Sequence, residues 1–161
     1  VSEIVMKISR LFKAVICLLL CFSLLGCKQS IDSSKTMDYS EVELSNVQSD
    51  YELIQKAEDI YETNMKKADT NTQKQVVTVK YLDDVYQIAS NRVNLDLEIL
   101  DAFSDKYMDY VATMQAYSEV YLEERNELVS NSKLTSISAA KDTDSGKMLE
   151  VLQGTVKTFS K

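Results

Sequence analysis

The feature that most constrains the fold is a seven-residue repeat of apolar side chains in the middle of the chain. The repeat has no polar exception and consists of Val79, Tyr86, Val93, Leu100, Tyr107, Met114, Tyr121 and Leu128. Apolar residues at Leu82, Ala89, Phe103, Tyr110 and Tyr117 complete the seam, which Asp96 and Glu124 interrupt. A strict repeat of this length predicts a left-handed supercoiled helix over about residues 73–129. A kink, if there is one, is expected at Asn91–Asn94, because asparagine is a poor helix former.

Shorter helices are expected on both sides of this central helix. The chain has no proline, and beyond residue 26 its only glycines are Gly146 and Gly154, so few positions oppose helix formation. Apolar residues at steps of three and four predict helices over about residues 44–69 and 147–158. We therefore expect an all-α fold, an antiparallel helical bundle or coiled coil in which each flanking helix packs on one half of the central helix. A kink would instead allow a compact bundle.

The N-terminal segment has the pattern of a secretory signal peptide. A basic stretch, Met6–Lys13, precedes Ala14–Leu25, in which Ser23 is the only clearly polar residue. As a helix, this apolar stretch would reach only about 18 Å, whereas the hydrocarbon core of a bilayer is about 30 Å thick. It is therefore too short to span a membrane and is typical of a cleavable signal.

The end of this signal, Leu24-Leu25-Gly26-Cys27, resembles the lipobox of bacterial prolipoproteins. The resemblance implies cleavage before Cys27, a diacylglycerol thioether on its sulfur, a further acyl group such as palmitate on its amine, and export to the cell envelope. By resemblance to enterobacterial sorting, Lys28 favours an outer-membrane protein that faces the periplasm. The predicted parts are a signal peptide (1–26), a lipidated flexible tether (27–42) and one helical domain (43–161).

Composition after residue 26 limits the chemistry. Removing the signal leaves 15 basic and 24 acidic residues, a net charge of −9, which argues against nucleic acid and favours a cationic partner or an apolar contact. The chain has no histidine, and Cys27 would be blocked by lipid. Zinc sites, thiol nucleophiles and the usual proton shuttles are therefore not expected. We predict no enzyme, no catalytic residue, no metal and no cofactor other than the lipid on Cys27.

Part of the helical seam admits two interpretations. Four tyrosines and a methionine lie together on it: Tyr107, Tyr110, Met114, Tyr117 and Tyr121. They can form the core, with each hydroxyl reaching its rim. Alternatively, this stretch is uncovered and forms an aromatic groove for a partner helix or an acyl chain.

The last residue, Lys161, permits a more specific hypothesis. A lipid-anchored helical protein with a C-terminal lysine resembles the murein lipoprotein, and the resemblance implies attachment of Lys161 to peptidoglycan. Our leading hypothesis is a non-enzymatic envelope lipoprotein that acts as an interaction, assembly or scaffold module, with an envelope protein as partner. The alternatives are an immunity or exclusion lipoprotein against a toxin, phage or conjugative element, and a peptidoglycan tether. Self-association into a homo-oligomer is left open.

Overall fold

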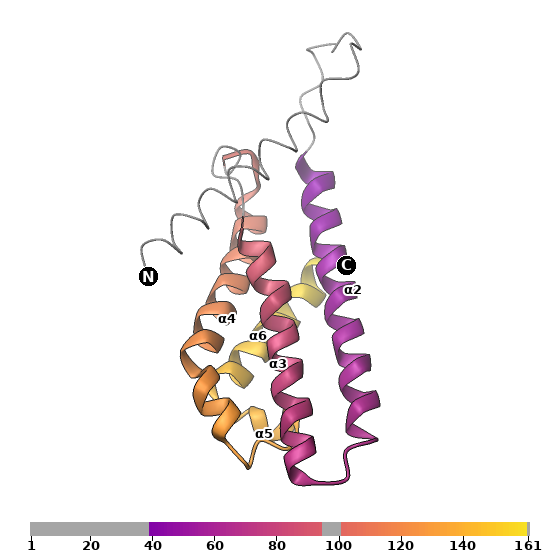
Figure 1. Cartoon of the computed structure of the whole chain (residues 1–161). Coiled ribbons are helices and arrows are strands. Elements are labelled where there is room, and N and C mark those ends of the chain that lie inside the picture. Colours follow the sequence, from indigo (N-terminus) through magenta and orange to yellow (C-terminus); the bar gives the residue numbers. More distant parts are fainter. Residues whose placement is uncertain (1–38, 95–100, 161) are drawn as a thin grey trace, which may run out of the picture. The chain divides into compact units, whose positions relative to one another are not determined.

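A computed structural model describes residues 39–94 and 101–160, and these residues form an all-α bundle (Figure 1). The helices are α2 (Tyr39–Met65), α3 (Asn71–Val93), α4 (Asp105–Ser130), the short α5 (Ile137–Ala140) and α6 (Asp144–Phe159). The described residues contain no strand. The predicted fold class, an all-α bundle with antiparallel helices, is confirmed.

The prediction of one continuous helix over residues 73–129 is wrong. Helix α3 ends at Val93, and the backbone of Asn94 is not helical (φ −77°, ψ 63°). Helix α4 begins after Ser104, whose hydroxyl accepts a hydrogen bond from the Tyr107 amide (3.1 Å). The chain thus leaves the helix where a kink had been considered, at Asn91–Asn94.

Helices α3 and α4 pack against each other as an antiparallel pair. Gln75, near the start of α3, donates a hydrogen bond to the Val129 carbonyl, near the end of α4. The seam residues Tyr86 and Tyr121 stack across the pair, with ring centroids 5.0 Å apart. The repeat keeps its phase on both sides of the break because both helices turn the same seam toward one core. Periodicity alone does not distinguish this arrangement from one long helix.

The first reversal of the chain lies between Met65 and Asn71, at the end of the first predicted helix (about residues 44–69), and the sequence Asp69–Thr72 there is polar. Thr70 caps α3, because its hydroxyl accepts a hydrogen bond from the Gln73 amide while the Gln73 side chain accepts one from the Thr70 amide.

Helix α2 begins at Tyr39, inside the segment 27–42 that was predicted to be a flexible tether. The remainder of that segment lies outside the described residues.

Helix α6 begins at Asp144, earlier than the predicted residue 147. Its first amides are capped by the carboxylate of Glu124, which accepts from Asp144 (3.1 Å) and Ser145 (2.7 Å). This contact explains why an acid interrupts the apolar seam at Glu124. Gly146 is required here, because a Cβ at this position would lie 1.9 Å from the Ala140 carbonyl oxygen.

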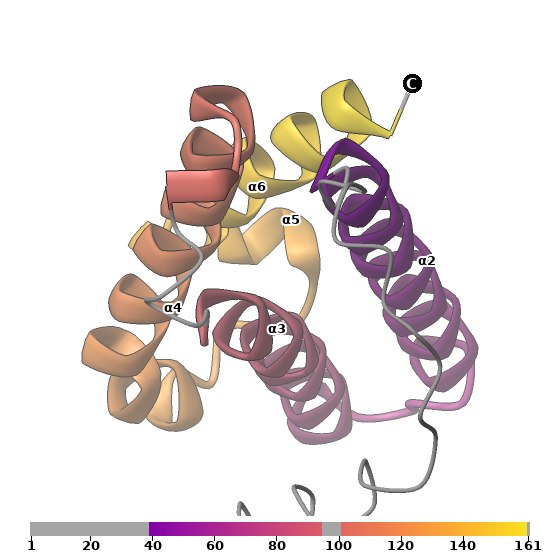
Figure 2. The ribbon, with the colours of Figure 1, turned by 90° about the horizontal axis from the view of Figure 1, so that it is seen from above.

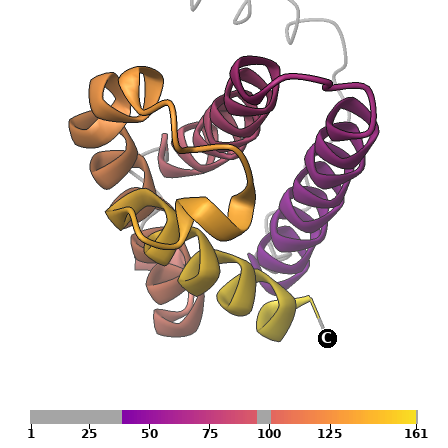
Figure 3. The same ribbon diagram turned by 90° about the horizontal axis from the view of Figure 1, so that it is seen from below.

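The core lies among α2, α3, α4 and α6. Seen from above, α3 stands between α2 and α4 (Figure 2), and seen from below, α6 closes the side opposite α3 (Figure 3). Five tyrosines are among its largest fully buried side chains: Tyr81, Tyr107, Tyr110, Tyr117 and Tyr121. Within the described ranges, no helix is long and apolar enough to cross a membrane.

Candidate functional site

The structure places the five predicted groove residues in the core. Tyr107, Tyr110, Met114, Tyr117 and Tyr121 are each at most 1 % exposed. Helix α6 packs over α4, and its Phe159 ring contacts that of Tyr110 with centroids 5.4 Å apart. The groove interpretation of this seam is therefore wrong, and the alternative interpretation as core is correct.

The hydroxyls of these tyrosines are used inside the bundle. Tyr117 donates to the carbonyl of Leu82 (2.8 Å), and Tyr121 donates to the carboxylate of Asp83 (2.8 Å). Both bonds join α4 to α3. Burying a hydroxyl without a hydrogen-bond partner destabilises a fold. These hydrogen bonds therefore allow the tyrosine hydroxyls to be buried in the core.

The protonation of these hydroxyls excludes them as bases at neutral pH. Burial and the hydrogen bond to Asp83 raise the pKa of Tyr121 to about 12. Burial and the negative charge of Glu58 raise the pKa of Tyr81 to about 12. Burial also raises the pKa of Tyr117 well above its usual value. These phenols stay neutral. The hydroxyls of Tyr117 and Tyr121 donate hydrogen bonds, and that of Tyr81 accepts one from the Gln153 side chain (3.0 Å).

A buried ion pair joins α2 to α3. The Arg92 guanidinium donates two hydrogen bonds to the Asp50 carboxylate (2.6 and 2.9 Å), and the Tyr110 hydroxyl donates a third (2.8 Å). Burial lowers the pKa of Arg92, but the hydrogen bond and charge of Asp50 raise it above its usual value. Asp50 is only 3 % exposed and its partners come from the bundle itself. We interpret this cluster as a structural tie.

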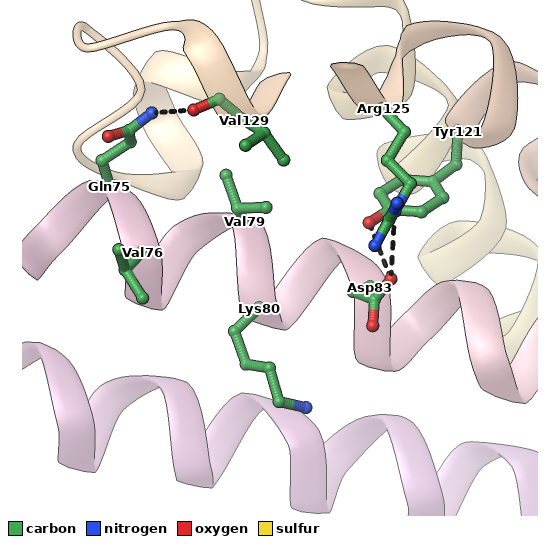
Figure 4. A pocket seen from close by; sticks show the side chains of 8 residues that line it. All are labelled: Gln75, Val76, Val79, Lys80, Asp83, Tyr121, Arg125 and Val129. Atoms are coloured by element: carbon green, nitrogen blue, oxygen red, sulfur yellow. Dashed lines mark hydrogen bonds and ion pairs between the residues drawn. The ribbon is translucent and has the colours of Figure 1, made fainter. Parts of the chain in front are cut away.

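An open apolar site lies on the outer side of the α3–α4 pair, away from α6. It is a groove of about 310 Å³. Helices α3 and α4 line it with Gln75, Val76, Val79, Lys80, Asp83, Tyr121, Arg125 and Val129 (Figure 4). We call it the outer groove and regard it as the candidate functional site.

The outer groove has an apolar end and a polar end. At the apolar end, Val79 faces Val129 (Figure 4), and Val129 is 55 % exposed. At the polar end, Asp83 accepts the Tyr121 hydroxyl and lies 3.8 Å from the Arg125 guanidinium. This arrangement can hold an apolar side chain and orient a polar one, but it brings together no nucleophile and general base.

Sequence reasoning missed this site because its most exposed apolar residues lie off the seven-residue seam. Val76 is 61 % exposed and Val129 is 55 % exposed. A signal was present, because Leu122 and Val129 are themselves seven residues apart and therefore share a second face of α4.

The other predicted site residues lie outside the described ranges. Cys27 precedes them and Lys161 follows them, so lipidation and attachment to peptidoglycan stay predictions. Within the described ranges, no group of His, Cys, Asp and Glu side chains could hold a metal ion.

The chain matches no protein-family model, no curated protein and no solved structure. Its function is therefore inferred from the outer groove and from the N-terminal sequence.

Proposed function

We propose that the chain is a non-enzymatic lipoprotein of the bacterial envelope that binds another envelope protein through the outer groove. The observation that carries the proposal is the exposure of Val76 and Val129 at a hollow on the surface of the bundle. Exposed apolar residues that gather at a concave site are typical of binding surfaces. A role in assembly or scaffolding is the activity that such a surface supports best.

Two features of the groove favour binding over catalysis. Its only phenol, Tyr121, has a pKa of about 12, and its carboxylate, Asp83, already accepts that hydroxyl. A general base needs a free site close to its substrate, and the groove offers none.

The membrane anchor in this proposal rests on Leu24–Cys27. Two or more acyl chains anchor a protein stably, whereas one holds it only marginally. Intact-mass measurement of membrane-extracted protein tests this part. We expect a chain that begins at Cys27 and carries the mass of its lipids, and a Cys27→Ser chain without them. An unmodified mature mass for the native chain would contradict it.

Site-specific photocrosslinking in cells tests the groove. A benzophenone-bearing amino acid replaces Val129 in one variant and Val151 in the control; Val151 is equally exposed (53 %) but lies on α6. We expect a discrete crosslink to one envelope protein from position 129 and none from position 151. The same products from both positions, or none from position 129, would contradict the proposal.

A further inference from the structure

Two further hollows adjoin the outer groove. One, of about 170 Å³, lies between α2 and α3 and includes Ile60, Val76 and Lys80 in its lining. The other, of about 330 Å³, lies at the turn between these helices and includes Lys67 and Val76. Val76 thus borders all three hollows, and Figure 4 shows Val76 and Lys80 extending from α3 on the side of α2. The three hollows form one surface across α2, α3 and α4.

We call this the outer-face surface and define it by Ile60, Lys67, Val76, Lys80, Arg125 and Val129. Its apolar members come from three different helices and are 45 %, 61 % and 55 % exposed in chain order. Because the exposed apolar residues are continuous across three helices, the surface is wider than the outer groove alone.

The charges on this surface have a consistent arrangement. The side chains of Lys80 and Arg125 are 62 % and 55 % exposed, whereas their partners Asp84 and Asp83 are only 28 % and 29 % exposed. Asp83 also accepts the Tyr121 hydroxyl. Lys67 is exposed and forms no ion pair with any residue that the structure describes. A ligand therefore meets basic groups first, although the net charge of the chain is −7.

We propose that the outer-face surface binds a short amphipathic helix of a protein partner, with apolar side chains on the contacting face and acidic side chains beside them. This inference rests on the proposed function and specifies the chemistry of the partner. It reverses the expectation of a cationic partner, which had been drawn from net charge alone.

The charges close to the surface decide whether an acidic or a basic partner helix binds more tightly. At physiological ionic strength, charges are largely screened beyond about 8 Å. A docked helix therefore senses Lys80 and Arg125 more strongly than acidic residues elsewhere on the bundle. Exposed ion pairs contribute little affinity each, so the apolar contacts supply binding while the charges select the partner.

The dimensions of the outer groove set the length of the partner segment. The lining extends from Gln75 to Asp83 on α3 and from Tyr121 to Val129 on α4, which is about 12 Å along each helix axis. This length matches about two helical turns. A helix satisfies its own backbone hydrogen bonds, and the described part of the chain offers no strand to which an extended segment could add.

Direct binding of two designed peptides tests the inference. The full lipidated protein is held in nanodiscs of zwitterionic lipid, and fluorescence anisotropy measures the binding of two helical peptides with the same apolar face. One peptide carries glutamates beside that face and the other carries lysines. We expect the acidic peptide to bind about tenfold more tightly, as two exposed ion pairs would give.

Matched charge reversals locate the effect. The double variant Lys80→Glu and Arg125→Glu should abolish or invert the preference for the acidic peptide. The control, Lys147→Glu and Lys157→Glu, makes the same change in charge on exposed residues of α6 and should leave the preference intact. Circular dichroism verifies that both variants keep their helices.

Several outcomes would overturn the inference. These are equal binding of the two peptides, tighter binding of the basic one, or a preference that survives the reversal of Lys80 and Arg125. Stronger binding to vesicles that contain anionic lipid would assign the surface to a membrane, and crosslinks from Val76 to a second copy would assign it to self-association. If both peptides fail but photocrosslinking at Val129 still identifies an envelope protein, the proposed function stands and only this inference fails.

Discussion

The two sides of the α3–α4 pair differ in what their side chains do. On the inner side, Tyr110 and Tyr117 are fully buried, and their hydroxyls donate to Asp50 of α2 and to the Leu82 carbonyl of α3. On the outer side, Val76 and Val129 are more than half exposed, and so are the side chains of the nearby bases Lys80 and Arg125. The aromatic residues of the seven-residue seam thus form the core, whereas valines that stand out less in the sequence form the open surface.

The two sides differ because the fold itself covers the apolar side chains on the inner side but not those on the outer side. Burying a large aromatic side chain is strongly stabilising, and each paired hydroxyl removes the cost of its desolvation. An exposed valine contributes little to folding and gains contacts only when a partner covers it. Substitutions on the inner side should therefore change stability, and substitutions on the outer side should change binding.

The largest expected effect comes from truncating a buried tyrosine. Tyr117→Ala leaves a cavity and an unpaired Leu82 carbonyl, and it should lower the free energy of unfolding by about 3–5 kcal/mol. Val129→Ala, on the outer side, should cost less than about 1 kcal/mol. Urea denaturation followed by circular dichroism measures both. Similar costs for the two variants would remove the distinction between the two sides.

Two ion pairs provide the same contrast in charge. Asp50→Ala leaves Arg92 without its buried partner and should cost about 3 kcal/mol of stability. Lys80→Ala removes one member of an exposed pair on the outer side and should cost at most about 1 kcal/mol. Thermal denaturation of the two variants measures the difference. A loss for Lys80→Ala as large as that for Asp50→Ala would contradict the assignment of Lys80 to a solvated surface.

The two glycines of α6 should respond oppositely to the same substitution. Gly146→Ala places a Cβ against the Ala140 carbonyl, so the backbone must shift, at a cost of about 1–3 kcal/mol. No atom outside its own stretch of helix lies within 4 Å of a Cβ at position 154. Gly154→Ala should therefore stabilise the protein by about 0.5–1 kcal/mol through helix propensity. Chemical denaturation measures the change in unfolding free energy of each variant. A change of the same sign in both would contradict either the close contact of Gly146 with the Ala140 carbonyl or the open surroundings of Gly154.

Alkaline pH should weaken the inner side selectively. The pKa of Tyr81 is about 12 in the fold, against about 10 in an unfolded chain, so its stabilising contribution is complete below pH 10 and is lost as pH rises toward 12. At pH 11 the loss is about 1 kcal/mol. Tyr81→Phe should reduce the slope of unfolding free energy between pH 10 and pH 12. An unchanged slope would show that Tyr81 does not contribute to it.

Local sequence rules predicted much of the fold. The polar residues Asp69–Thr72 lie at the first turn, where Thr70 caps α3, because capping chemistry is local. The last helix was predicted from residue 147, whereas α6 begins at Asp144. The hairpin of α3 and α4 was not predictable in the same way. A seven-residue repeat indicates only that its residues face a common core. A hairpin of two helices meets this condition as well as one long helix does.

The candidate site was less predictable than the fold. The tyrosines of α4 differ from an exposed aromatic groove only in whether α6 covers them, and coverage is a tertiary property. Val76 lies off the seam and becomes notable only when α2 and α4 bring Ile60 and Val129 beside α3. The preference for acidic ligands likewise depends on which side chains are exposed, which net charge does not reveal.

Thiol labelling of the folded protein tests the contrast between the two sides most directly. In a chain whose three native cysteines are replaced by serine, Val129→Cys and Met114→Cys each introduce one thiol on α4. We expect maleimide to label position 129 at the rate of an exposed thiol and position 114 about a hundredfold or more slowly, because labelling there requires unfolding. Rapid labelling of position 114, or protection of position 129, would contradict a closed tyrosine core and an open outer surface.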